Sequence, residues 1–268
     1  DYFKTFDNIK NAFIKYVKLL PDDGYLIANG DDSNCMDLLQ YTNAKTITYG
    51  ITNKKTNFFA VNIVFDNDGF PEFDVYHNDE FYERIKLSVP GMHNVLNALS
   101  CIALCDAYHI DKKYIKSALL KFTGAHRRFE FKGKINNIAS VYDDYGHHPT
   151  EIIATAKSLM NKKYNKSWVI FQPHTYSRTK TLLEDFAKAL LNFDNIIVLD
   201  IYAARENNTY NITSKDLVNE ICSLGKDAHY IPDFNECVNF VKNNVQDGDI
   251  VITLGAGTVT QVGPLLVK

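Results

Sequence analysis

The chain has 268 residues, of which 46% are hydrophobic, and its formal net charge at pH 7 is −3. This length allows one large domain or two ordinary ones with a sizeable core. The sequence has no long basic stripe, so we do not expect nucleic acid as a partner. It also has no apolar run near the ~20 residues of a membrane helix, so we do not expect a membrane partner either.

Cysteine usage indicates the compartment. The five cysteines are odd in number and include no C-x-x-C pair. Cys101 and Cys105 lie four residues apart in an apolar, helical pattern, which is typical of small buried side chains in a reducing compartment. We therefore predict a cytoplasmic protein. The chain starts at Asp1 without an initiator Met, directly before an amphipathic pattern, and we interpret it as the later part of a longer protein.

The first half mixes helices with strands. A helix with one apolar face is expected first, followed by a strand, a short helix and a second strand, at 5–20, 25–28, 32–40 and 45–49. Three antiparallel strands are expected next, as an appendage on an α/β core, at 58–66, 72–78 and 83–89. Asn67-Asp68-Gly69 is a turn signal between the first two of them. Helices over 93–109 and 112–122 end this half.

After Gly124 the pattern changes to strand–helix alternation. Strands are expected at 128–133, 138–143, 167–172, 195–200, 227–231 and 249–254. Helices are expected at 149–160, 178–191, 214–223, 233–244 and 258–266. Such alternation predicts a mostly parallel, Rossmann-like sheet with helices on both faces. The fold class is therefore α/β, and we predict two domains, 1–124 and 125–268.

A dense polar cluster follows the strand expected at 138–143. It brings two carboxylates, a tyrosine and two histidines into six residues: Asp143, Asp144, Tyr145, His147 and His148. Pro149 suits the first position of a helix, and Glu151 suits its positive end. The cluster therefore lies at the carboxyl end of a strand, where open α/β sheets bind ligands.

Three other expected strands end in unusual residues, over 172–179, 200–206 and 255–258. Parallel strands would bring these ends to one edge, together with Arg178, Arg205, His174, His147, Tyr145 and Asp144. Such a lining suits a small zwitterion or a phosphate-bearing ligand, because a guanidinium grips a carboxylate with two hydrogen bonds. The Gly-Ala-Gly run at 255–257 either binds an anion through its N–H groups or serves tight packing.

Two hypotheses from other classes of function stay open at this point. One is a metal-dependent hydrolase that uses Asp143, Asp144, His147, His148 and His174. Adjacent histidines rarely bind the same ion and no H-x-x-x-H spacing occurs, so we predict no metal ligand in this chain. The other is a binding module without catalysis. No G-x-x-x-x-G-K-[ST] motif for phosphate binding occurs in the 268 residues.

Five runs of residues carry a resemblance: P-G-M-H-N-V-L-N-A at 90–98, G-A-H-R-R-F at 124–129, D-D-Y-G-H-H-P-T-E at 143–151, F-Q-P-H-T-Y-S-R-T at 171–179 and Y-A-A-R-E at 202–206. Together they are similar to the Mur ligases, the ATP-dependent amide-forming enzymes of peptidoglycan precursor synthesis. The last three runs look like the branch that joins L-alanine to UDP-N-acetylmuramate. An alternative is a sibling such as the murein tripeptide recycling ligase.

The resemblance implies a reaction and a role for each domain. ATP would phosphorylate the muramate carboxylate, and the alanine amine would attack the acyl phosphate. Residues 1–124 would be the last part of the central ATP-binding domain, and 125–268 the amino-acid-binding domain. The P-loop and most Mg²⁺ ligands would lie in a missing N-terminal part, so these 268 residues alone are expected to be inactive.

The resemblance also implies site residues. The adenine would be lined by His93, Asn94 and Asn97, the phosphates approached by Arg127 or Arg128, and the ribose held by Asp144. The L-alanine would be surrounded by Tyr145, His147, His174 and Arg178, of which the last three are the candidate catalytic residues. Thr175 stands where many members carry Arg, which leaves one anion contact in doubt.

Overall fold

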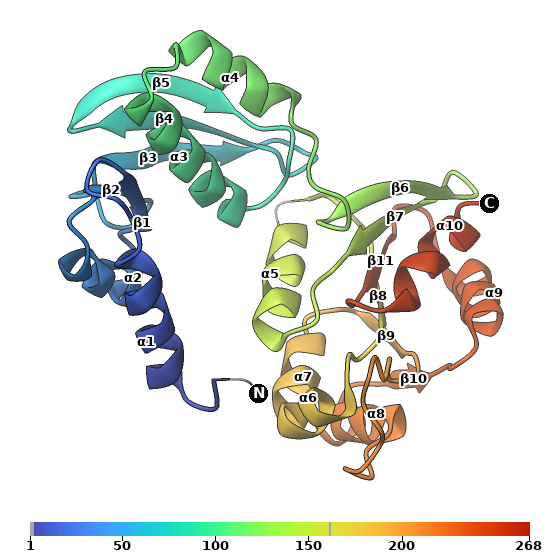
Figure 1. The fold of residues 1–268 in the computed structure, drawn as a ribbon. Helices are drawn as coiled ribbons and strands as arrows, with labels where there is room; N and C mark the ends of the chain where they lie inside the picture. The colour runs from blue at the N-terminus through green and yellow to red at the C-terminus, as the bar shows by residue number, and fades with distance from the viewer. Residues whose placement is uncertain (1–2, 161) are drawn as a thin grey trace. The chain divides into compact units, whose positions relative to one another are not determined.

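The structure is a computed structural model that describes residues 3–160 and 162–268. The chain divides into two compact units, Asp1–Thr123 and Gly124–Lys268 (Figure 1). Among the described residues, none of the helices combines the length and the hydropathy that crossing a bilayer requires.

The first unit holds one five-stranded sheet in the order β1-β2-β3-β4-β5. Its strands are β1 (Tyr25–Asn29), β2 (Lys45–Gly50), β3 (Phe58–Phe65), β4 (Pro71–His77) and β5 (Glu80–Lys86). Its helices are α1 (Phe6–Val17), α2 (Ser33–Leu38), the 3₁₀ turn η1 (Leu39–Tyr41), α3 (Met92–Ala107) and α4 (Lys112–Lys121). The packed side of the sheet meets α3 and α4 through a core that includes Phe58, Phe73, Val95, Leu99 and Ile115.

Two details of this sheet differ from the sequence-based expectation. The antiparallel strands are no separate appendage, because β3 pairs in parallel with β2 through Tyr49 opposite Phe58. The last strand also begins at Glu80 instead of residue 83. Asn78 and Asp79 have φ values of 49° and 66° and form a two-residue hairpin turn, a conformation for which Asn and Asp are well suited.

A single carboxylate joins the loops that follow β1 and β2. Asp31 accepts hydrogen bonds from the backbone N–H groups of Ile51 at 2.7 Å, Thr52 at 3.1 Å and Asn53 at 2.7 Å. Burial alone would raise the pKa of Asp31, but these three hydrogen bonds together lower it. A Cβ on Gly50 would lie 2.7 Å from the Asp31 carboxylate, which explains the glycine there.

We predict that Asp31→Asn lowers the stability of the first unit by about 1 kcal/mol, since the carboxylate is partly exposed to solvent. Because the folded pKa of Asp31 is lowered, its contribution is present above the unfolded pKa and is lost as the pH falls through the folded value. Amide hydrogen exchange at Ile51 to Asn53 should accelerate at pH 7. Asp22→Asn, at an exposed carboxylate of the same unit, is the control. Unchanged exchange in Asp31→Asn would contradict the prediction.

The second unit is a six-stranded sheet in the order β10-β9-β8-β11-β7-β6. Its strands are β6 (Glu130–Ile135), β7 (Ala139–Asp144), β8 (Ser167–Phe171), β9 (Asn195–Val198), β10 (Ala228–Tyr230) and β11 (Ile250–Leu254). All neighbours are parallel except β6, which pairs antiparallel with β7. Its helices are α5 (Pro149–Leu159), α6 (Tyr176–Thr181), α7 (Leu183–Leu190), α8 (Ser214–Ser223), α9 (Phe234–Asn244), η2 (Thr258–Gln261) and α10 (Val262–Leu266).

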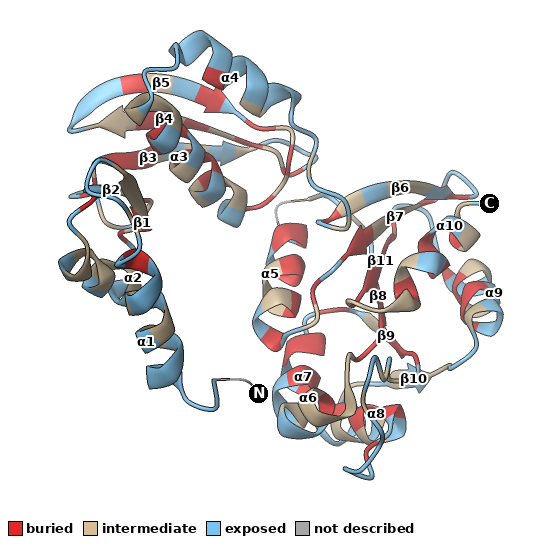
Figure 2. Ribbon diagram, in the orientation of Figure 1, coloured by how far each residue is buried: buried red, intermediate tan, exposed pale blue. Residues whose placement is uncertain are grey.

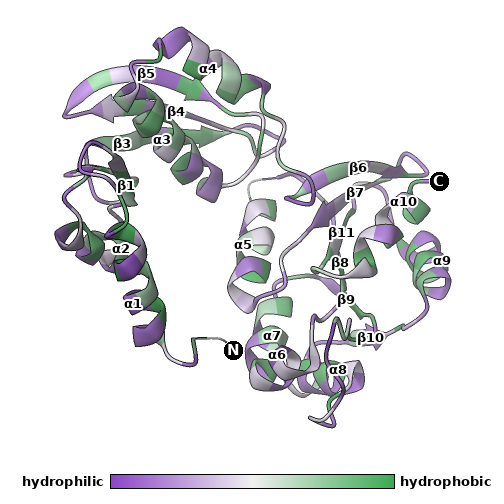
Figure 3. Cartoon of the chain, in the orientation of Figure 1, coloured by the Kyte–Doolittle hydropathy of each residue, from purple (hydrophilic) through white to green (hydrophobic). Residues whose placement is uncertain are grey.

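Both faces of this sheet are covered. Val169 and Phe171 of β8 face a core shared with α5, α7 and α8, whereas Trp168 and Ile170 face a second core shared with α9 and α10. Figure 2 shows buried residues along β7, β8, β9 and β11, and Figure 3 shows hydrophobic residues along β8, β9 and β11. Burial on two faces is the reason that these strands read as continuous apolar runs instead of alternating ones. The mixed, mostly parallel α/β class expected from the sequence is confirmed.

The helix expected over 178–191 is two helices. It breaks at Leu182, where φ is −113° and ψ is 24°, between α6 and α7. The six-residue α6, which carries Arg178, is therefore a separate helix. The segment expected at 258–266 is likewise divided, into η2 and α10.

Candidate active site

Four parallel strands of the second unit end at the same level. In the sheet register Leu254 lies opposite both Asp144 and Phe171, and Phe171 lies opposite Val198. The four segments that follow these strands therefore leave the sheet side by side, as the sequence predicts. The candidate site is built from these segments and from the turn that precedes β6.

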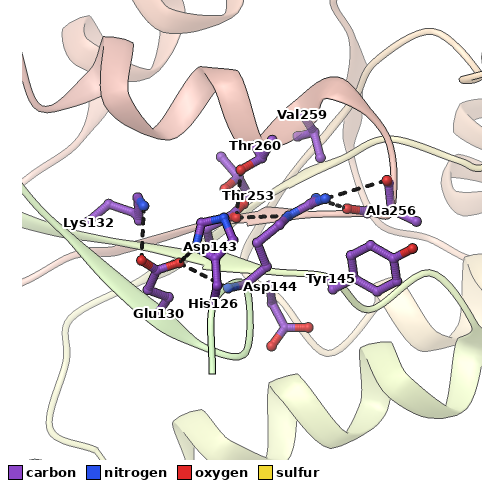
Figure 4. A network of polar contacts seen from close by, with 12 residues as sticks. His126, Glu130, Lys132, Asp143, Asp144, Tyr145, Thr253, Ala256, Val259 and Thr260 are labelled. Atoms are coloured by element: carbon purple, nitrogen blue, oxygen red, sulfur yellow. Dashed lines mark hydrogen bonds and ion pairs between the residues drawn. The ribbon is translucent and has the colours of Figure 1, made fainter. Parts of the chain in front are cut away.

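A buried carboxylate joins three parts of this edge. Asp143 at the end of β7 is fully buried and accepts hydrogen bonds from the hydroxyls of Thr253 at 2.6 Å and Thr260 at 2.8 Å. Its Oδ2 also lies 3.2 Å from Nε of Arg127, whose side chain is 13% exposed (Figure 4). Asp143 thus holds three segments together: the turn that precedes β6, the strand β11, and η2, which follows β11.

The remaining donors of Arg127 point at the glycine loop that follows β11. They reach the carbonyl oxygens of Gly255, Ala256 and Gly257, the second of these at 3.5 Å. A Cβ on Gly257 would lie 2.5 Å from Oε1 of Gln172, so the loop needs glycine for close packing. The sequence left two roles open for the run at 255–257, anion binding and tight packing. The structure favours tight packing, because the carbonyl groups of the run are directed to the Arg127 guanidinium.

The two adjacent arginines differ in exposure. Arg127 is committed to Asp143 and to the glycine loop, whereas the Arg128 side chain is 57% exposed and lies 3.8 Å from Glu151. Their guanidinium carbons lie 4.9 Å and 5.8 Å from the ring centre of Tyr145. Arg128 is therefore the better placed of the two for an external anion, and phosphate contact by either one stays a prediction.

Asp144 is 7% exposed and directed inward. Its carboxylate accepts hydrogen bonds from the backbone N–H groups of Phe129 at 2.8 Å and Gly146 at 2.7 Å. Burial raises the pKa of this carboxyl, although these hydrogen bonds oppose the shift. The structure thus gives Asp144 a role in holding the turn, and the predicted ribose contact stays a prediction.

Four rings form a row across the edge. The centre of Tyr145 lies 5.2 Å from that of His147, His147 lies 5.7 Å from His174, and His174 lies 5.5 Å from Tyr202. They come from the segments after β7, β8 and β9. Three of the four predicted alanine contacts are therefore neighbours.

The fourth predicted contact, Arg178, lies on α6 next to this row. One terminal nitrogen of its guanidinium is 3.5 Å from Nδ1 of His174. Burial lowers the pKa of His174, and the positive charge of Arg178 lowers it further. The His174 imidazole is therefore neutral at pH 7, with a cation beside it.

The second adjacent histidine, His148, caps a helix. His148 is the N-cap of α5, where its ring accepts from the Thr150 N–H, while Glu151 accepts from the His148 N–H in a capping box. Among residues 3–160 and 162–268, no group of three or more His, Cys, Asp or Glu side chains could hold a metal ion. His148, one of the five residues considered for a metal-dependent hydrolase, is therefore used to cap α5.

The predicted adenine contacts belong to the first unit, at the start of α3. His93 and Asn97 are exposed, and Asn94 is half-buried. The Asn97 amide donates to Oδ1 of Asn94 at 3.1 Å, and the Asn94 amide donates to the carbonyl of Pro90 at 2.7 Å. The asparagines therefore have fixed orientations on one turn of the helix. Their contact with adenine stays a prediction.

Sequence reasoning gave no role to three residues of the site. Tyr202 ends the ring row, Gln172 supports the glycine loop through its contact with the Val259 N–H at 2.9 Å, and Glu206 caps α6. Tyr202 and Glu206 stand in the 202–206 run, and Gln172 in the 171–179 run, so their place in the motifs was the available signal.

Comparisons with known proteins agree with this geometry. A family model described as the Mur ligase middle domain matches residues 1–105, and another, described as Mur ligase, glutamate ligase domain, matches residues 127–257. The chain belongs to the Mur ligase family.

Several Mur ligases are similar over the whole chain. The UDP-N-acetylmuramate–L-alanine ligase of Acetivibrio thermocellus is 46% identical over 268 residues, which are 100% of this chain and 57% of that protein. The enzyme of the same name from Caldanaerobacter subterraneus is 45% identical over 98% of this chain and 57% of its own length. The chain thus spans less than two thirds of the relatives that it matches.

Solved Mur ligase structures have the same fold. The UDP-N-acetylmuramate–alanine ligase of Thermotoga maritima superposes with a TM-score of 0.78 and is 27% identical, over 99% of this chain and 55% of that one. A murein peptide ligase from Psychrobacter arcticus has a TM-score of 0.66 at 22% identity, over 97% and 54% of the two chains, and supports the fold alone.

We predict that Asp143→Asn destabilises the second unit by about 3–5 kcal/mol, because it leaves the largely buried Arg127 charge without its carboxylate. The fluorescence of Trp168, the single tryptophan, reports unfolding of this unit in urea. Asp247→Asn, at an exposed carboxylate of the same unit, should shift the midpoint little. Equal shifts in the two variants would show that the buried pair does not have this role.

We also predict that Arg178→Gln raises the pKa of His174, because the largest nearby positive charge is removed while burial persists. A pH titration of the His174 ring by NMR measures the change. Arg205→Gln is a matched control, since Arg205 is exposed on the segment after β9. The prediction fails if the two variants titrate alike.

Proposed function

We propose that this chain forms part of an enzyme that ligates L-alanine to UDP-N-acetylmuramate with consumption of ATP, through an acyl phosphate, in peptidoglycan precursor synthesis. The observation that carries the proposal is the contact of Arg178 with the ring row at the carboxyl edge of the sheet. The name and the 46% identity of the Acetivibrio relative support the choice of substrates.

The site offers a separate group for each end of a small amino acid. The planar guanidinium of Arg178 suits a carboxylate, which it fixes in orientation by paired hydrogen bonds. His174 beside it is neutral at pH 7, so it accepts or donates a hydrogen bond without repelling an ammonium group. We propose that Tyr145 and His147 close the other side of this subsite. Fixing the carboxylate orients the amine for attack on the activated acyl group.

The residues of this chain suit parts of a nucleotide. Asn94 and Asn97 present oriented amides that match the donor and acceptor edge of adenine, and the exposed Arg128 suits a phosphate. A solved Mur ligase from Thermotoga maritima is in complex with ADP, at 15% identity to this chain. The described residues include no group of three or more His, Cys, Asp or Glu side chains that could hold a metal ion, and we propose that most Mg²⁺ ligands come from elsewhere in the enzyme.

The remaining alternatives are less well supported. Another Mur ligase would share the fold, but three relatives that are 46%, 45% and 42% identical carry the L-alanine ligase name. A binding module without catalysis is less well supported, because the relatives similar over the whole chain carry the name of a ligase. The prediction that Cys101 and Cys105 are buried is wrong, because Cys101 is exposed and Cys105 is half-buried on α3. The proposal of a cytoplasmic location rests instead on the five cysteines being free thiols.

We predict that Arg178→Lys, in the protein encoded by the complete reading frame, lowers catalytic efficiency with L-alanine by about 30-fold or more. A lysine ammonium keeps the charge but cannot hold the carboxylate in a plane. The KM for ATP should change little. Steady-state phosphate release with each substrate varied in turn gives both values.

Arg84→Lys is the control for this experiment, because it makes the same change at a partly exposed arginine of β5 that has no place in the proposed site. It should leave both KM values near wild type. If ATP dependence collapses in Arg178→Lys while alanine dependence is unaltered, Arg178 belongs to the nucleotide subsite and the proposed alanine contact is wrong.

A further inference from the structure

The helix that carries Arg178 has no N-cap of its own. Thr175 occupies the N-cap position of α6 with φ at 68°, and its side chain makes no capping hydrogen bond. For a β-branched residue this left-handed conformation is strained. The first N–H groups of α6 therefore need an acceptor from elsewhere in the unit.

Glu206 supplies that acceptor from the segment after β9. Its carboxylate accepts the backbone N–H of Ser177 at 2.9 Å and the Ser177 hydroxyl at 2.5 Å. The backbone N–H of Tyr176 also interacts with it. Although Glu206 lies 29 residues beyond Ser177 in the sequence, it acts as the N-cap of α6.

Backbone hydrogen bonds hold the two segments together around this contact. The Thr175 N–H donates to the carbonyl of Tyr202 at 2.9 Å, and the Tyr202 N–H donates to the carbonyl of Pro173 at 2.8 Å. The Glu206 N–H closes a turn on the carbonyl of Ala203 at 2.9 Å. These hydrogen bonds hold the backbone that carries Glu206 in place next to α6.

The charge of Glu206 also acts on the site. Burial alone would raise the pKa of Glu206, but the hydrogen bonds from Ser177 and Tyr176 and the charge of Arg178 together lower it. The carboxylate is thus ionised at neutral pH. It opposes the effect of Arg178 on the pKa of His174, which shows that it acts on both residues of the alanine subsite.

We propose that Glu206 is a positioning residue for amino-acid binding, which holds the first turn of α6 so that Arg178 and His174 face the substrate carboxylate together. The proposal rests on the proposed function. Ser177 directly precedes Arg178, so a shift of the helix start moves the guanidinium with it. Glu206 acts through α6 and needs no contact with substrate.

Steady-state kinetics of the protein from the complete reading frame test this role. Glu206→Ala should raise the KM for L-alanine about tenfold, the effect of losing a helix cap, with KM for ATP unchanged within about twofold. Glu206→Gln keeps an oxygen acceptor for the Ser177 N–H, so it should restore part of the loss. Ser177→Ala removes only the hydroxyl contact and should raise the KM for L-alanine less than Glu206→Ala does.

Glu184→Ala is the matched control, because Glu184 is exposed on α7 and lies 3.5 Å from Lys188 in an i,i+4 pair. It should leave all KM values at the wild-type level. Trp168 fluorescence in urea shows whether each variant retains its fold. A second readout needs no turnover: in the 268-residue chain, Glu206→Gln should lower the pKa of His174 further, as measured by NMR.

The outcomes separate the inference from the function on which it rests. If the wild-type protein shows no alanine-dependent phosphate release, the proposed function fails and the inference fails with it. If the wild type is active and folded Glu206→Ala keeps its KM for L-alanine, only the inference is overturned. Should Glu206→Ala not fold, unchanged alanine KM values in both Glu206→Gln and Ser177→Ala overturn it equally.

Discussion

The buried Asp143 carboxylate is the constraint on which the rest of the site depends. An ion without solvent requires several donors, and Asp143 receives them from Arg127, Thr253 and Thr260. These donors come from the turn before β6, from β11 and from η2, so satisfying one charge aligns three segments. Arg127 extends the alignment to the glycine loop through the carbonyl groups of residues 255–257.

Strand register then determines which side chains lie close together at the edge. Because Asp144, Leu254, Phe171 and Val198 lie in one row, the segments behind them begin at the same height. His147, His174 and Tyr202 follow three different strands and still contact one another. The parallel sheet thus converts distant positions in the sequence into neighbours, and the two cores on its faces keep the strand ends rigid.

Sequence reasoning identified the strands and the edge, because apolar runs and turn residues are local signals. It could not separate Arg127 from Arg128, since only packing shows that the first is 13% and the second 57% exposed. It placed one helix over 178–191, because nothing in the local pattern marks the break at Leu182. It missed Glu206 as a cap, because an N-cap 29 residues away has no periodic signature. The hairpin turn at Asn78 was readable from residue types and was overlooked.

The carboxylates within the edge are bound by donors of the protein itself. Asp143 is satisfied by hydroxyls and a guanidinium, Asp144 by backbone N–H groups, and Glu206 by the start of α6. Each acid is therefore used to hold the protein in shape. The cations beside them, Arg178 at the ring row and Arg128 at the rim, lie at the part of the edge where a ligand would bind. Because hydrogen bonds within the protein hold these three acids, the two guanidinium groups are the charges of this edge that could meet a carboxylate or a phosphate, and the proposed site depends on that arrangement.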